Sequence, residues 1–391
     1  MSGNENPGDE RELLVGAAAL VSGGRVLRPG WLRAGGGRVV EAAEGPPPRT
    51  PDLDFGDAAV VPGFVDMHVH GGGGGTYTTG ETDEILRAVA FHRRHGTTTT
   101  VASLVSAGPE ALLRQVRALR EPVAEGLLAG IHLEGPWISH GRCGAHDPSV
   151  LRDPDQAEIA RLLEAGEGSI IMVTVAPELY GALEAITALT VAGVVVAVGH
   201  TDATYEQTRA AIAAGARVGT HLFNAMRPLH HREPGPVLAL LEDERVTVEL
   251  VGDGVHVHDG LVAHVAADIG PRRIALVTDA MVAAGMADGA YRLGSLDVQV
   301  TDGIARVRAT GAIAGSTATM ASLFERAVRR LPGPRDEVLV AVTEMTSSTP
   351  ARTLGLDDVG DLVPGRQADW VVVRDGRVRE VYRRARPVGT D

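Results

Sequence analysis

Hydrophobic and polar positions follow two different patterns along the chain. Residues 13–61 consist of short apolar runs separated by Gly and Pro turns, which is typical of small antiparallel strands. Residues 354–391 repeat this pattern and carry the pair Asp375-Gly376 between two strand-like runs, which is a hairpin signal. We therefore predict that the two ends of the chain combine into one small β-sandwich domain.

The middle of the chain, residues 62–353, alternates apolar runs with amphipathic segments. Eight runs are rich in β-branched residues and almost continuously apolar, like parallel strands covered on both faces. The runs are AVVPGFVDMHVH, TTTTVASLV, LLAGIHLEGP, SIIMVTVAPE, VVVAVGHT, RVGTHLFN, VTVELVGDGVH and RIALVTDA. The helices predicted between them include Thr82–His95, Asp155–Ala165, Thr204–Ala214 and Asp259–Ile269. This order predicts an α/β fold, a (β/α)₈ barrel of the TIM type, with Tyr291–Val307 as an inserted hairpin and a last helix from about Ser316.

Composition narrows the class of partner. With 391 residues and 44% hydrophobic content, the chain can fill one large core and a small appended domain. A formal net charge of -13 gives no positive field for nucleic acid or an anionic membrane, so a small-molecule partner is expected. Cys143 is the only cysteine and the polar N-terminus does not resemble a signal peptide, so we expect a cytoplasmic protein, with residues 1–12 as a disordered tail.

The chain lacks lysine and nucleotide-binding motifs, and it contains a run of glycines. The chain contains no lysine, which excludes a Schiff-base lysine and a carbamylated lysine between two metals. It has no Walker motif and no Rossmann fingerprint after the first strand, so a nucleotide cofactor is not expected. The run Gly71–Gly75 is interpreted as a flexible loop, with a simple turn as the alternative.

Potential metal ligands follow the predicted barrel strands, at the end where such barrels carry their active sites. They are His68, His70, Glu134, His200, His221, Asp253, His256 and Asp279. His68 and His70 are two residues apart, so both side chains point to one face of a strand. A single histidine is explained as a satisfied structural residue, and we interpret His132 in this way. The whole set is not explained in this way, because so many buried imidazoles and acids need a metal or a substrate as a hydrogen-bond or coordination partner.

A series of short motifs runs through most of the chain, from about Pro62 to the AD of PGRQAD. In order they are PGFVDMHVHG, HLEGPWIS, GAHDP, GHTDAT, THLFNAM, HHREPG, GDGVHV, LVTDA and GAIAGS. This series resembles the motif set of the N-acetylglucosamine-6-phosphate deacetylases, a family of the amidohydrolase superfamily. PGFVDMHVHG marks only the superfamily, whereas HLEGP, THLFNAM and REPG are more discriminating.

The resemblance implies a metal-dependent site. Glu134, His200 and His221 would hold a principal divalent ion, with zinc as the default and iron, cobalt or manganese also compatible with the nitrogen and oxygen donors. Because the chain retains His68 and His70, a second ion bridged by Glu134 stays open, with Asp279 as a further ligand. One or two ions are therefore expected, and Cys143 is interpreted as a bystander.

The resemblance also implies the reaction. It is hydrolysis of the acetamide of N-acetyl-D-glucosamine 6-phosphate to D-glucosamine 6-phosphate and acetate, in amino-sugar metabolism. Asp279 would take a proton from a metal-activated water and pass it to the leaving amine, and His146 would polarise the acetyl carbonyl. From the residues alone, Asp279 is also compatible with a helix N-cap.

The sugar phosphate is implied to lie among further residues of the barrel mouth. Arg232 and His256 would offer charge-assisted hydrogen bonds to the phosphate. By the same resemblance, Arg232 would reach the neighbouring subunit's active site, which implies a homodimer. The other residues implied to bind substrate are Ala145, His146, Asn224, Ala225, Asp253, Ile313, Ala314 and Gly315.

Two alternatives stay open at this point. One is another amidohydrolase reaction, such as deacetylation of the galacto epimer, deamination or opening of a cyclic amide. The other is a non-catalytic scaffold, against which the complete set of candidate ligands speaks. Resemblance in fold does not decide the substrate.

Overall fold

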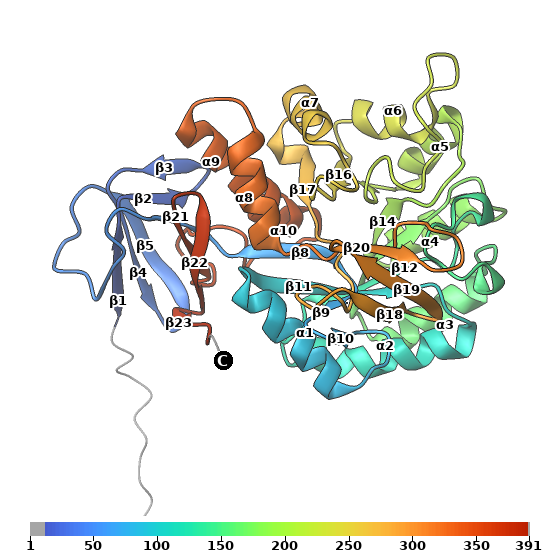
Figure 1. The fold of residues 1–391 in the computed structure, drawn as a ribbon, viewed down its shortest axis with the longest axis horizontal. Helices are drawn as coiled ribbons and strands as arrows, with labels where there is room; N and C mark the ends of the chain where they lie inside the picture. Colours follow the sequence, from blue (N-terminus) through green and yellow to red (C-terminus); the bar gives the residue numbers. More distant parts are fainter. Residues whose placement is uncertain (1–11, 390–391) are drawn as a thin grey trace, which may run out of the picture.

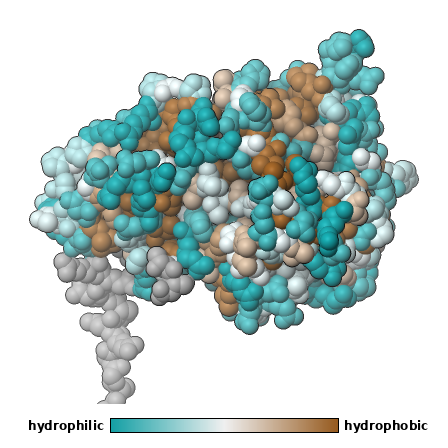
Figure 2. Space-filling view, in the orientation of Figure 1, coloured by the Kyte–Doolittle hydropathy of each residue, from teal (hydrophilic) through white to brown (hydrophobic). Residues whose placement is uncertain are grey.

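The computed structural model describes residues 12–389, and Figure 1 shows a large α/β body beside a smaller group of strands. Of the predicted disordered tail, only Glu12 belongs to the described residues. On the face seen in Figure 2, hydrophilic side chains cover much of the surface and hydrophobic ones form smaller groups between them. No helix within residues 12–389 is long and apolar enough to cross a membrane.

Eight parallel strands form the large body, and each is hydrogen-bonded to the next in chain order. They are β8 Phe64–Val69, β11 Thr97–Val105, β12 Gly130–Glu134, β13 Ile170–Val175, β14 Val195–Val198, β15 Val218–Gly219, β16 Thr247–Leu250 and β17 Ile274–Leu276. Nearly every residue in them is buried, because helices cover the outside and side chains fill the inside. The predicted (β/α)₈ barrel is confirmed.

The barrel closes between the first and the last strand, just beyond the end of β17. There the backbone N–H of Asp279 donates to the carbonyl oxygen of His68 at 2.8 Å, and the N–H of His70 donates to the carbonyl of Ala280 at 2.8 Å. Three of these four residues are candidate site residues, and the fourth, Ala280, follows Asp279 directly. The hydrogen bonds that close the barrel therefore also bring His68 and His70 next to Asp279.

The helices for which both ends were predicted agree with the observed bounds to within one residue. They are α1 Thr82–Arg94, α2 Pro109–Ala124, α3 Gln156–Gly166, α4 Ala182–Val191, α5 Tyr205–Ala214, α6 Gly235–Glu242, α7 Asp259–Ile269, α8 Met320–Arg330, α9 Arg335–Thr343, a π-helical turn Glu344–Ser348 and α10 Thr349–Thr353. The helix after strand eight begins at Met320 rather than near Ser316. Ser316 instead bridges to Ala280, and Thr319 caps the helix by accepting from the N–H of Ser322.

The segment predicted as an inserted hairpin is a three-stranded meander, made of β18 Gly289–Leu293, β19 Leu296–Thr301 and β20 Ile304–Val307. The predicted segment covered all of the meander except Gly289 and Ala290, and its error was the number of strands. The meander has its own small core, which includes Leu293 and Val298 and also takes in Val105 from the end of β11 and Ala145 from the loop after β12. This packing holds the meander over the barrel mouth.

The smaller group of strands consists of two sheets built from both ends of the chain. One contains β1 Leu13–Ala17, β4 Gly30–Gly35, β5 Arg38–Glu44 and β6 Leu53–Asp54. The other contains β2 Ala19–Ser22, β3 Arg25–Leu27, β7 Ala59–Pro62, β21 Trp370–Arg374, β22 Arg377–Arg383 and β23 Arg386–Pro387. The two ends meet where β7 pairs with β21, and Figure 1 shows the blue and red strands side by side. A common core with Leu32 from one sheet and Trp370 from the other makes this a sandwich.

Two glycine positions show where local pattern and tertiary contact differ. The first predicted barrel strand is split at Gly63 into β7 and β8, which belong to different sheets, and a Cβ at Gly63 would lie 2.2 Å from Thr98 Oγ1. The glycine run expected as a flexible loop is a tight hairpin of β9 Gly71–Gly72 and β10 Gly75–Thr76. A Cβ at Gly75 would lie 2.2 Å from the carbonyl oxygen of Glu84, so only glycine fits.

Candidate active site

The candidate residues gather at the carboxyl ends of the barrel strands. His68 lies in β8 and Glu134 ends β12, whereas His200, His221 and Asp279 lie two or three residues beyond the ends of β14, β15 and β17. These last three have positive φ angles of 47°, 26° and 49°. Such backbone is uncommon for residues other than glycine and is found at functional sites, where the surrounding structure compensates the strain. Here it turns each side chain away from the strand direction and over the barrel mouth.

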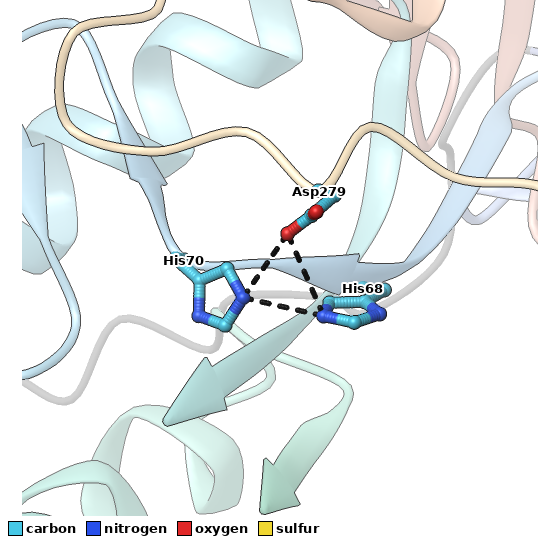
Figure 3. Close-up of side chains that lie close together, drawn as sticks. All are labelled: His68, His70 and Asp279. Atoms are coloured by element: carbon cyan, nitrogen blue, oxygen red, sulfur yellow. Dashed lines mark hydrogen bonds and ion pairs between the residues drawn. The ribbon is translucent and has the colours of Figure 1, made fainter. Parts of the chain in front are cut away.

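His68, His70 and Asp279 form a first group, and Figure 3 shows the three side chains turned toward one another. The Nε2 atoms of His68 and His70 are 3.2 Å apart, and Oδ1 of Asp279 is 3.2 Å from Nε2 of His70 and 3.7 Å from Nε2 of His68. Nδ1 of His70 lies 3.1 Å from the carbonyl oxygen of Ser103 and donates to it. Nε2 of His70 therefore faces the group, and it presents a lone pair whenever the ring is neutral.

Glu134 links this first group to a second one. Its Oε1 lies 3.0 Å from Nε2 of His200 and 2.9 Å from Nε2 of His221, while its Oε2 lies 3.1 Å from Nε2 of His70. Nδ1 of His200 donates to the carbonyl oxygen of Arg142 at 2.9 Å, so its Nε2 also presents a lone pair. All these side chains are buried.

The donor atoms fit a divalent metal. A lone pair on Nε2 of His200 and a carboxylate oxygen of Glu134 repel each other at 3.0 Å unless a positive charge lies between them. Burial alone lowers the pKa of His70, but its hydrogen bonds to Asp279 and Glu134 outweigh this and raise the pKa to about 9. The site thus favours positive charge, and its nitrogen and oxygen donors suit zinc and other first-row divalent metals.

His146 lies beside these groups, and its Nε2 is a hydrogen-bond donor rather than a metal ligand. The backbone N–H of Ser106 donates to its Nδ1 at 3.2 Å, so the proton of the neutral ring sits on Nε2, 3.3 Å from Oε2 of Glu134. Burial lowers the pKa of His146 to about 4, which keeps the ring neutral near pH 7. A protonated Nε2 does not bind a metal, but it can donate to a substrate carbonyl.

His256 and Asp253 form a separate pair at the edge of the mouth. Nδ1 of His256 donates to Oδ2 of Asp253 at 2.8 Å, and Oδ1 of Asp253 accepts the backbone N–H groups of Val255 and His256. Burial lowers the pKa of His256, but the hydrogen bond to Asp253 outweighs it and raises the pKa. The ring therefore offers a charge-assisted donor at Nε2.

A cavity of about 350 Å³ opens above the two metal-ligand groups. Most of the predicted site residues line it, namely His70, Glu134, Ala145, His146, His200, His221, Asn224, Ala225, His256, Asp279, Ile313 and Gly315. His68 lies below its floor and is 0% exposed. Three other predicted residues do not line it. Asp253 stands behind His256, Ala314 is buried with its N–H donating to Ala305, and Arg232 is exposed on another loop with Nη1 2.8 Å from Nε2 of His231.

The structure also separates structural residues from site residues. His132 is a satisfied core histidine, with Nδ1 2.9 Å from Oγ of Ser103 and Nε2 2.8 Å from Oγ1 of Thr174. Asp279 caps no helix, since the next helix begins at Met320.

Several residues near the site were missed by sequence analysis. Arg142, Val105, Leu293 and Ala312 line the cavity without matching any chemical pattern. Glu249 lies in β16, fully buried, with Oε2 2.9 Å from Nδ1 of His68. A lone acid within the apolar run VTVELV was the signal that could have revealed Glu249.

Comparisons with known proteins agree with this geometry. Residues 59–388 match the family model described as the amidohydrolase family. The chain is 55% identical, with a TM-score of 0.95, to a solved structure of a variant of N-acetyl-D-glucosamine-6-phosphate deacetylase from Mycobacterium smegmatis in complex with N-acetyl-D-glucosamine-6-phosphate, over 97% of this chain and 100% of that one.

Two curated relatives extend the comparison. N-acetylgalactosamine-6-phosphate deacetylase from Escherichia coli O157:H7 is 38% identical over 83% of this chain and 86% of its own length. N-acetylglucosamine-6-phosphate deacetylase from Lysinibacillus sphaericus is 35% identical over 80% of this chain and 81% of its own. With its barrel, its two groups of metal-ligand side chains and these relatives, the chain belongs to the amidohydrolase family and, within it, to the N-acetylglucosamine-6-phosphate deacetylases.

Proposed function

We propose that this protein hydrolyses the acetamide of N-acetyl-D-glucosamine 6-phosphate, releasing acetate and D-glucosamine 6-phosphate. The observation that carries the proposal is one cavity in which a buried carboxylate, Asp279, and a neutral donor, His146, face a metal-binding set of imidazoles and Glu134. At about 350 Å³, the cavity has the size of a small-molecule site. An amide is a poor electrophile, and these are the groups that its hydrolysis needs.

The proposed chemistry divides between the cation and the chain. When bound, a divalent cation lowers the pKa of water and withdraws electrons from a carbonyl oxygen. Asp279 takes a proton from the attacking water and delivers it to the amine nitrogen as the carbon–nitrogen bond breaks. Burial raises the pKa of Asp279, but the hydrogen bond to His70 and the charge of His68 outweigh it and lower the pKa. The carboxylate is therefore ionised and ready to accept.

His146 would bind the acetyl group during this step. Its Nε2–H is aimed into the cavity by the hydrogen bond that Nδ1 accepts from Ser106. A fixed donor at the carbonyl oxygen stabilises the negative charge that develops there, without reorganising during the reaction.

For the cation we propose zinc. Imidazole nitrogens with carboxylate oxygens are ordinary zinc donors, and open catalytic zinc sites keep a position for water or substrate. Glu134, His200 and His221 would hold the principal ion. Iron, cobalt and manganese suit the same donors, so metal analysis of the purified protein decides between them.

We propose further that the protein is a homodimer in which Arg232 completes the phosphate site of the neighbouring copy. Within its own chain Arg232 is exposed and lies outside the cavity. Among the described residues that line the cavity, the only arginine is Arg142, and Asp202 already binds its guanidinium at 2.8 Å. Phosphate binding by His256 alone leaves much of a dianion's charge unpaired.

Acetate release tests the proposal directly. Purified, metal-analysed protein is incubated with N-acetylglucosamine 6-phosphate, with the unphosphorylated sugar and with a chelator-treated control. We expect acetate only from the phosphorylated sugar and only with metal. A protein with a filled metal site that releases no acetate would refute the proposal.

The galacto epimer is the second candidate substrate, because the 38% identical relative from Escherichia coli O157:H7 carries that name. The two sugars differ at one hydroxyl group. The same assay with N-acetylgalactosamine 6-phosphate, compared by kcat/KM, decides which epimer the cavity favours.

A further inference from the structure

One carboxylate at the barrel mouth has no part in the proposed reaction. Glu249, in β16, is 0% exposed. Its Oε2 accepts from Nδ1 of His68 at 2.9 Å and from the backbone N–H of His221 at 3.1 Å. Its Oε1 has no hydrogen-bond partner within residues 12–389. Burying a carboxylate with half of its acceptor capacity unused is costly unless positive charge nearby compensates it.

Glu249 determines which nitrogen of His68 carries the proton. A carboxylate only accepts hydrogen bonds, so Nδ1 of His68 must be the donor, and Nε2 of the neutral ring keeps its lone pair. That Nε2 faces the ligand group, at 3.4 Å from Oε1 of Glu134 and 3.7 Å from Oδ1 of Asp279. The tautomer that Glu249 selects is the one that can bind a metal.

The same oxygen connects the two groups of ligands. His68 belongs to the group with His70 and Asp279, whereas Nε2 of His221 lies 2.9 Å from Oε1 of Glu134. Oε2 of Glu249 holds the ring of the first histidine and the backbone of the second. The ring of His70 is oriented by the neutral carbonyl of Ser103. The ring of His68 is oriented by the charged carboxylate of Glu249.

We propose that Glu249 is a positioning residue for His68, one that fixes the tautomer of this ring and raises the affinity of the site formed by His68, His70 and Asp279 for a divalent cation. Its buried negative charge and its fixed hydrogen bond act together on that ring. Removing the partner of a metal-binding histidine typically weakens metal affinity by about 10- to 100-fold. The proposal rests on the metal-dependent function above in one respect, the presence of a cation, and concerns the affinity of the site that contains His68.

A purely structural role makes a different prediction. If Glu249 only satisfied two buried N–H groups, its removal would lower the unfolding temperature of the metal-free protein and leave the ratio of the two metal affinities unchanged. The affinity ratio is therefore the decisive quantity, and the thermal unfolding of metal-free protein is measured beside it.

The experiment titrates metal-free full-length protein with Co²⁺, followed by calorimetry and by visible absorption. The variants are Glu249→Gln, which keeps an acceptor but removes the charge, and Glu249→Leu, which removes both. The matched control is Glu178→Gln, an acid at the same end of the barrel that binds Thr201 and the N–H of Asp202 and contacts no ligand side chain.

We expect two cations in the wild-type protein and in Glu178→Gln. In Glu249→Gln the weaker cation should lose at least tenfold in affinity while the tighter one changes less than about threefold, and Glu249→Leu should lose more. The proposal would be overturned if both Glu249 variants bound two cations with wild-type affinities. It would also be overturned if the wild-type protein were saturated by one cation. If Glu249→Leu does not fold, the nearly isosteric Gln variant decides alone.

Acetate release by the wild-type protein, measured in parallel, separates the two proposals. Turnover with one bound cation overturns the role of Glu249 and leaves the proposed reaction. Two cations that depend on Glu249 without any turnover support its role and refute the reaction.

Discussion

Replacing Asp279 with Asn removes the proposed proton acceptor and one candidate metal-ligand oxygen while keeping the backbone contacts of this position. Asn has nearly the same shape and tolerates the left-handed backbone, where φ is 49°. The backbone N–H to His68 and the carbonyl that accepts from Ser316 are unaffected by the change. A loss of turnover in Asp279→Asn therefore reports on the carboxylate and not on the fold.

The expected size follows from the role. A positioned general acid and base contributes about 10²- to 10⁴-fold to rate, which corresponds to about 3–5 kcal/mol of transition-state stabilisation. We expect kcat to fall by that factor and KM to change less than about threefold, because Asp279 acts on the water and the leaving amine. Loss of one oxygen at the His68–His70 group also weakens metal binding, so the assay is run with metal added to saturation.

The assay is acetate release from N-acetylglucosamine 6-phosphate with metal content measured on the same samples. Asp268→Asn, an exposed aspartate on α7, serves as the control and should behave as wild type. Asp279→Asn protein that keeps more than about a tenth of the wild-type kcat with a filled metal site would refute the role of Asp279.

Three further predictions concern substrate binding and stability. Arg232→Ala should raise KM for the phosphorylated sugar at least tenfold, since a charge-assisted contact is lost; an unchanged KM, or a monomer by light scattering, would contradict the shared site. Asp253→Asn should raise KM roughly 10- to 100-fold with kcat nearly constant, because His256 loses its charged partner; steady-state kinetics that show a loss in kcat alone would speak against this. Burial lowers the pKa of His92 to about 4, below the usual value near 6.5, so the unfolded chain binds a proton that the folded chain does not, and stability falls as pH drops from about 6.5 to 4. His92→Gln should remove roughly 2–3 kcal/mol of that fall in urea unfolding between pH 7 and 4.5, and parallel curves for the two proteins would show that His92 is not responsible.

Much of the architecture was predictable because it rests on local periodicity. Parallel barrel strands are apolar on both faces and amphipathic helices repeat every 3.6 residues, so helix bounds such as Asp259–Ile269 were recovered as predicted. The C-terminal hairpin at Asp375-Gly376 followed from turn chemistry, and both residues have positive φ angles of 54° and 70°. At Gly63, Gly75 and Ser316, a contact with a distant segment determines where a strand or helix begins or ends, and the local pattern did not predict it.

The amino-acid sequence by itself determined which polar side chains come to the barrel mouth, because the ends of parallel strands meet at one edge whatever the details of packing. Only the tertiary structure decided what each of them touches. It placed Asp253 behind His256, turned His146 into a donor through Ser106, and brought Glu249 against His68, a partner 181 residues away. The physical reason is that a hydrogen bond depends on tenths of an ångström between strands, and closure of the barrel sets those distances.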